Sequence, residues 1–83
     1  MLDRVKSLLG VQGDYQDDTI NGYIDEVIEF LHDSGIFEYY ITPGIVARGV
    51  SDLWNYGSGE AKFSEYFLQR TAQLAYKSGD PNI

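Results

Sequence analysis

Apolar side chains recur along this chain at intervals of three and four residues, the spacing of one face of an α-helix. The clearest case spans residues 17–33, where one apolar stripe contains Ile20, Tyr23, Ile24, Val27, Ile28 and Leu31. The opposite side carries four carboxylates, Asp25, Glu26, Glu29 and Asp33. An amphipathic pattern of this kind predicts a helix that buries its apolar stripe. Asp17 or Asp18 is expected to cap its start, and Ser34-Gly35 is expected to end it.

Three further segments show the same periodicity. Residues 2–9 predict a short first helix with Leu2, Val5, Leu8 and Leu9 on its apolar face and Gly10 as its C-terminal cap. Thr42-Pro43 is a typical helix start, and the apolar positions that follow it predict a third helix as far as Trp54. Ser64 is expected to cap a fourth helix. Its predicted inner face consists of Phe67, Leu68, Thr71, Leu74 and Ala75.

Two details of the third predicted helix concern its packing. Gly49 lies near the apolar face, where the absence of a side chain would let another backbone come close. Arg48 and Asp52 are four residues apart and are expected to form an exposed ion pair.

The pattern as a whole predicts an all-α fold, a small bundle of about four short helices. Residues 36–41, IFEYYI, are too few for more than an extended connector or an isolated strand between the second and third helices. We expect a single helical domain over residues 1–79 and a flexible C-terminal tail over residues 80–83.

The length and composition suggest a protein that associates with other chains. A chain of 83 residues buries only about 60% of its unfolded surface, so it is marginally stable alone. It contains no cysteine, which excludes disulfides and thiolate zinc sites. Small domains without such links often gain stability by oligomerisation.

The net charge of the chain indicates which kinds of partner it can bind. Thirteen acidic residues against six Lys and Arg give a formal net charge of −7. Such a surface repels phosphates and disfavours sequence-specific nucleic-acid binding, which needs a clustered basic face. It suits a basic partner, or a protein that must not adhere to DNA. The sequence shows neither a signal peptide nor a membrane-spanning stretch, so we expect a cytoplasmic protein that binds no membrane.

Three candidate sites for chemistry are weak, so we predict no enzymatic activity, no cofactor and no metal. His32 is the only histidine, and no nucleophile or metal ligand accompanies it. Residues 17–22, DDTING, resemble the start of a calcium loop, but the position of the bidentate glutamate holds Ile28. The glycines of YGSGE, residues 56–60, lack the strand-to-helix context of a phosphate-binding loop and favour a flexible loop.

Aromatic residues are too many for so small a core. The chain has seven Tyr, four Phe and one Trp. Six tyrosines fall in loops or beside the apolar stripes: Tyr15, Tyr39, Tyr40, Tyr56, Tyr66 and Tyr76. Tyrosine and tryptophan are enriched at protein interfaces, so the surplus indicates an interaction surface. The alternative is that several of these rings fold back onto the helices as a rim.

Nearly the whole chain resembles a known family. The N-terminal LDRVKSLLG, the helix DDTINGYIDEVIEFL and the stretch TPGIVARGVSDLWNYGSGEAKFSEYFLQRTAQLA are similar to the small head–tail connector (adaptor) proteins of tailed phages and prophages, often labelled DNA-packaging proteins. The most distinctive part is VSDLWNYGSG followed by FSEYF. These are packing and interface motifs, and none of them is catalytic.

The resemblance implies a helical structural subunit of the virion. Identical copies would form a ring, dodecameric on the virion, beneath the portal protein. The ring would extend the DNA channel and offer a docking surface to the next connector or tail-completion protein. The protein would then be found at the head–tail interface of the virion, and in the host cytoplasm during assembly.

Within such a ring, the resemblance suggests roles for two sets of residues. The predicted oligomer or portal interface comprises Trp54, Tyr56, Phe63, Tyr66, Tyr39 and Tyr40. In this picture Trp54 packs beneath the loop 55–63, which grips a neighbour. The acidic residues predicted to face the channel are Asp25, Glu26, Glu29 and Asp33. A second reading remains open, in which the chain is a small acidic helical regulator, possibly a DNA mimic, that binds a basic protein.

Overall fold

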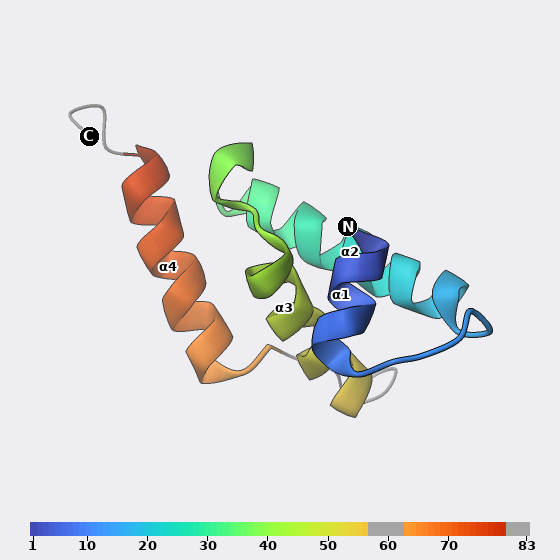
Figure 1. Ribbon diagram of the computed structural model, residues 1–83. Helices are drawn as coiled ribbons and strands as arrows, with labels where there is room; N and C mark the ends of the chain where they lie inside the picture. Colours follow the sequence, from blue (N-terminus) through green and yellow to red (C-terminus); the bar gives the residue numbers. More distant parts are fainter. Residues whose placement is uncertain (57–62, 80–83) are drawn as a thin grey trace.

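The computed structural model describes residues 1–56 and 63–79, without the side chains of residues 55 and 56. It contains four α-helices and one turn of 3-10 helix (Figure 1). Their bounds are α1 Leu2–Leu9, α2 Asp17–Asp33, η1 Glu38–Tyr40, α3 Pro43–Tyr56 and α4 Glu65–Gly79. These ranges contain no strand, and the predicted all-α bundle is confirmed.

Helix α3 is the centre of the fold, because α1, α2 and α4 all pack against it. Figure 1 shows α4 at one end of the molecule and the connector between α1 and α2 at the other. The core is formed by apolar side chains from all four helices and from the segment around η1. Its buried members are Val5, Ile20, Ile24, Val27, Leu31, Ile36, Ile41, Ile45, Val46, Ala47, Val50, Leu53, Phe67 and Leu74. The predicted stripe of α2 therefore does face the interior.

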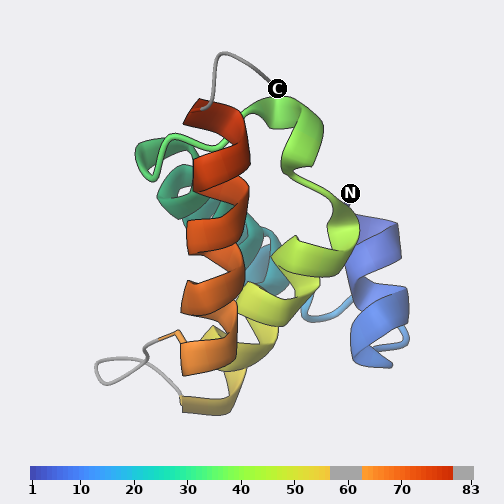
Figure 2. The same cartoon turned by 90° about the vertical axis from the view of Figure 1, so that its left-hand side faces the viewer.

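Helix α4 lies on the opposite side of α3 from α1 (Figure 2), and its buried residues are Phe67, Thr71, Leu74 and Ser78. Phe67, Thr71 and Leu74 are buried as predicted, but Leu68 is 45% exposed. Successive residues of an α-helix are rotated by about 100°, so Leu68 lies to the side of a face centred on Phe67. In α1, Val5 is fully buried, whereas Leu8 is 49% exposed.

The helix ends show which of the predicted capping residues serve as caps. Gly10 ends α1 in the left-handed region with φ 76°, as predicted. The Oγ of Ser64 accepts a hydrogen bond from the amide of Phe67 at 3.2 Å, which confirms the predicted cap of α4. The prediction for α2 is wrong, because Gln16 is its N-cap residue. Asp17 lies inside the first turn, where its carboxylate contacts Lys6 at 2.6 Å.

The segment between α2 and α3 is only partly extended. Phe37 and Ile41 have extended backbones, whereas Glu38–Tyr40 form one turn of 3-10 helix. In this turn the Tyr40 and Ile41 amides donate to the carbonyls of Phe37 and Glu38, at 2.9 and 3.0 Å. An isolated extended strand would leave these backbone groups without protein partners, so the turn is favoured. The Phe37 amide donates to Ser78 Oγ at 2.9 Å, which ties this segment to the end of α4.

Two packing predictions concern α3. The space beside Gly49 is occupied by the side chains of Val27 and Phe67. Arg48 lies over the ring of Tyr66, with its guanidinium carbon 4.6 Å from the ring centre. Asp52 instead accepts a hydrogen bond from the amide of Ser64 at 2.9 Å. The predicted ion pair between Arg48 and Asp52 does not form, since both side chains connect α3 to the start of α4.

Candidate interaction site

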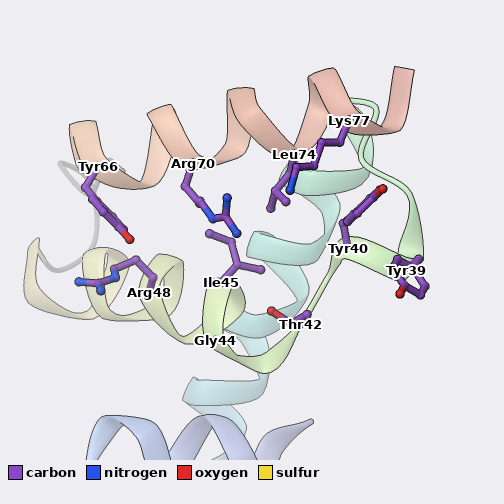
Figure 3. A pocket seen from close by; sticks show the side chains of 10 residues that line it. All are labelled: Tyr39, Tyr40, Thr42, Gly44, Ile45, Arg48, Tyr66, Arg70, Leu74 and Lys77. Atoms are coloured by element: carbon purple, nitrogen blue, oxygen red, sulfur yellow. The ribbon is translucent and has the colours of Figure 1, made fainter. Parts of the chain in front are cut away.

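A groove lies between α4 on one side and η1 and the start of α3 on the other (Figure 3). It encloses about 570 Å³. Three tyrosines and three cationic side chains are among its lining, so we call it the tyrosine–cation groove. The full lining is Tyr39, Tyr40, Thr42, Gly44, Ile45, Arg48, Tyr66, Arg70, Leu74 and Lys77.

The helical register of α4 supplies one wall of the groove. Tyr66, Arg70 and Lys77 are spaced by four and seven residues, so they lie along a single stripe of the helix. Leu74 borders this stripe and is buried, as is Ile45 on the opposite wall. The groove therefore has apolar side chains in its floor and polar groups at its rim, a combination typical of recognition sites.

The groove is positively charged, in contrast to the acidic chain as a whole. It contains three of the six Lys and Arg residues, and no carboxylate is among its described lining residues. Arg48 stacks on Tyr66, and Arg70 donates to Gln73 Oε1 at 3.0 Å. Among the described residues, Lys6 forms an ion pair with Asp17, and His32 contacts Glu38; none of these residues lines the groove. The groove cations therefore retain donors for an acceptor outside the protomer.

Three of the six predicted interface residues meet at this groove. Tyr39 is 86% exposed and Tyr66 is 59% exposed, whereas Tyr40 is half-buried. The rings of Tyr39 and Tyr40 are perpendicular, with their centres 5.3 Å apart. Exposed rings beside an apolar floor can bury further area when a partner covers them.

Two of the other predicted interface residues, Trp54 and Phe63, lie outside the groove. Trp54 is half-buried and packs edge-on against Tyr23 of α2, with ring centres 6.2 Å apart. Phe63 is half-buried, and its ring centre lies 4.7 Å from that of Phe30 and 4.5 Å from that of Phe67. The side chain of Tyr56 and the rest of the predicted gripping loop, residues 57–62, are outside the described residues, as is the predicted tail 80–83. Within the protomer, Trp54 and Phe63 therefore join helices together.

The four carboxylates predicted to line a channel share the outer surface of α2. Asp25, Glu26, Glu29 and Asp33 are all exposed, on the side of the helix away from its buried stripe. Their common orientation is compatible with a channel surface, and their place in an assembly stays a prediction.

The structure also places the weak candidate sites that the sequence contains. His32 Nε2 lies 2.7 Å from Glu38 Oε2, and both side chains are largely exposed. Residues 17–22 lie in α2, in place of a calcium loop. No group of three or more potential metal ligands occurs among the described residues. None of the described helices is both long enough and apolar enough to cross a membrane.

Sequence reasoning missed the cationic half of the groove. The spacing in the sequence favours a pair of Arg48 with Asp52, and Lys77 fits the favourable interaction of a cation with the C-terminal end of its helix. The available signal was the stripe of Tyr66, Arg70 and Lys77 along one side of the last helix. The contribution of η1 to the opposite wall had no such signal.

The described residues form a small all-α bundle with an exposed groove lined by tyrosines and cationic side chains. Residues 1–78 match the family model of the phage gp6-like head-tail connector protein. The chain belongs to this family, as its resemblance predicted. Neither the curated proteins nor the solved structures include a significant match to it.

Proposed function

We propose that copies of this connector protein assemble into a ring, dodecameric on the virion, between the portal and the next connector or tail-completion protein. The family match over residues 1–78 carries this proposal, because it assigns the chain to phage structural connectors. The exposed rings support it. Tyr39 and Tyr66 flank an apolar-floored groove that a single protomer leaves open.

In such a ring we expect the acidic surface of α2 to face the DNA. Asp25, Glu26, Glu29 and Asp33 would present like charge to the phosphates, and DNA would pass without adhering. Replacing all four by the corresponding amides should increase retention of DNA by assembled rings at low salt. Unchanged retention, with the four positions on the outer wall of the ring, would exclude this arrangement.

Assembly is the decisive test of the proposed function. The full chain is mixed with isolated portal rings, and the complexes are measured by light scattering after gel filtration and imaged by electron microscopy. We expect the chain to add a closed ring to one end of the portal, and to form large species alone at high concentration. A chain that remains monomeric at every concentration and never joins a portal ring would refute the proposal.

A further inference from the structure

We propose that the tyrosine–cation groove of one copy receives the connector between α1 and α2 of the next copy, with Asp14 and Tyr15 at its tip. The inference rests on the proposed ring and names the two surfaces that join its subunits. It assigns an acidic occupant to a groove whose cations have no carboxylate partner among the described residues.

The connector, residues 10–16, has the chemistry that the groove requires. Asp14 is exposed and Tyr15 is 83% exposed, so a carboxylate and an aromatic ring are open to solvent at consecutive positions. The carboxylate can accept hydrogen bonds from Arg70 or Lys77, and the ring can stack on the groove tyrosines. A groove of about 570 Å³ has room for these two side chains. The acidic face of α2 offers carboxylates without an exposed aromatic ring, so it is the less suitable occupant.

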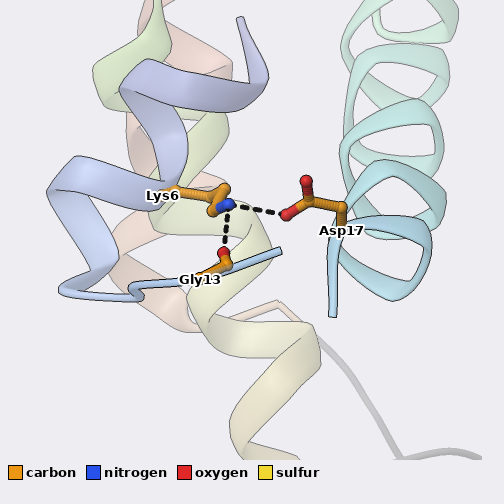
Figure 4. Close-up of polar contacts among 3 residues, drawn as sticks. All are labelled: Lys6, Gly13 and Asp17. Carbon is orange, nitrogen blue, oxygen red and sulfur yellow. Dashed lines mark hydrogen bonds and ion pairs between the residues drawn. The ribbon is translucent and has the colours of Figure 1, made fainter. Parts of the chain in front are cut away.

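The connector is also held in place before any partner binds. Lys6 Nζ donates to the carbonyl of Gly13 and to Asp17 Oδ1, and so links α1, the connector and α2 (Figure 4). Gly13 has φ 79°, in the region where glycine is favoured, and the Asp17 amide donates to the carbonyl of Asp14 at 3.2 Å. A segment fixed in this way loses less conformational entropy on docking than a free loop does.

Figure 1 shows the connector on the far side of the molecule from α4, the helix that forms one wall of the groove. A contact that joins two different surfaces is heterologous, so each copy binds one neighbour by its groove and the other by its connector. Such contacts generate a ring when the rotation between copies closes. A symmetric dimer that faced groove to groove would instead bring together three cations from each copy.

Charge reversal tests the contact. Asp14→Lys and Arg70→Glu are prepared singly and together in the full chain, with Asp25→Lys as a control of equal charge change on α2. Each of the first two should raise the protein concentration needed for half-maximal ring formation, on the portal or in solution, by about tenfold or more, because close charge pairs across interfaces couple strongly. The double variant should recover most of the lost ring formation. Asp25→Lys should form rings at the same protein concentration as the parent protein.

Cysteine cross-linking gives a second readout that does not depend on charge. The chain has no cysteine, so an introduced pair reacts without background. Tyr15→Cys combined with Tyr66→Cys should yield a ladder of disulfide-linked multimers on oxidation. Tyr15→Cys combined with Tyr76→Cys is the control, since Tyr76 is exposed on α4 but does not line the groove. Helical circular dichroism verifies that each variant is folded.

The outcomes separate this inference from the proposed function. Normal rings from folded Asp14→Lys and Arg70→Glu, without a cross-linked ladder, would overturn the groove contact and leave the ring proposal intact. Loss of assembly in Asp25→Lys that Arg70→Glu rescues would assign the groove to α2 of the neighbour, and would also overturn it. A parent protein that forms no ring with or without the portal would refute both.

Discussion

Replacing Gly49 by alanine tests how tightly α2, α3 and α4 are packed. Gly49 is buried in α3, and a Cβ at this position would lie 2.9 Å from Cγ1 of Val27 and 2.8 Å from Cε1 of Phe67. Carbon atoms prefer separations of about 3.5–4.0 Å, so the added methyl group must displace one of these neighbours. Phe67 has little room to move, because it is fully buried and its ring packs against Phe30 and Phe63.

The magnitude follows from two opposing effects. Alanine is favoured over glycine within a helix by about 1 kcal/mol. Inserting a methyl group into a well-packed core costs about 1–3 kcal/mol. The free energy of unfolding should therefore fall by about 1 kcal/mol, although helix propensity alone would predict a gain of the same size. For a domain of this length, that change lowers Tm by about 4–8 °C.

Urea unfolding followed by circular dichroism, at one low protein concentration, measures the effect. Gly22→Ala is the matched control, because Gly22 lies inside α2, is exposed, and would place its Cβ with nothing within 4 Å. This control should gain about 1 kcal/mol, so the two variants should differ by about 2 kcal/mol. Equal stabilisation by both substitutions would refute the close packing around Gly49.

Three other substitutions test single polar groups, each by the free energy of unfolding. Ser64→Ala removes the N-cap of α4 and should lower the free energy of unfolding by about 1 kcal/mol. An unchanged value would mean that water fully replaces the hydrogen bond of the cap. Thr71 is buried, and its Oγ1 has no hydrogen-bond partner in the described structure. Thr71→Val should therefore raise the free energy of unfolding by about 1 kcal/mol. The control Thr19→Val, at an exposed position, should change it little. A clear decrease for Thr71→Val would show that the hydroxyl does form a hydrogen bond. Ser78→Ala leaves the Phe37 amide without its acceptor, so it should cost about 1 kcal/mol and speed hydrogen exchange at that amide; unchanged exchange would contradict the bond.

The helices were predictable from sequence because periodicity, caps and glycines indicate the same boundaries. The stripe of α2 is buried at Ile20, Ile24, Val27 and Leu31, and Gly10 and Ser64 act as the predicted caps. The errors occur where tertiary contacts outweigh local preference. Asp17 contacts Lys6 of α1 instead of capping its own helix, because the α1–α2 connector brings the two charges together.

The groove could be predicted only in part. An excess of aromatic residues indicated an interaction surface, and Tyr39, Tyr40 and Tyr66 do line one groove. The sequence could not place Trp54 and Phe63 within the protomer, because their partners Tyr23 and Phe30 are far away along the chain. The position of η1 beside α4 likewise depends on a contact between residues 37 and 78, which no local pattern encodes.

Because Trp54 is the single tryptophan and lies edge-on to Tyr23, the protein carries an intrinsic fluorescent probe of one particular contact. Its indole borders a small cavity with Leu9 and Val11, so its emission reports the junction of the first three helices. The circular dichroism signal, in contrast, sums over every helix, α4 included. Comparing the two signals during denaturation would therefore reveal whether the last helix detaches before the remainder of the molecule melts.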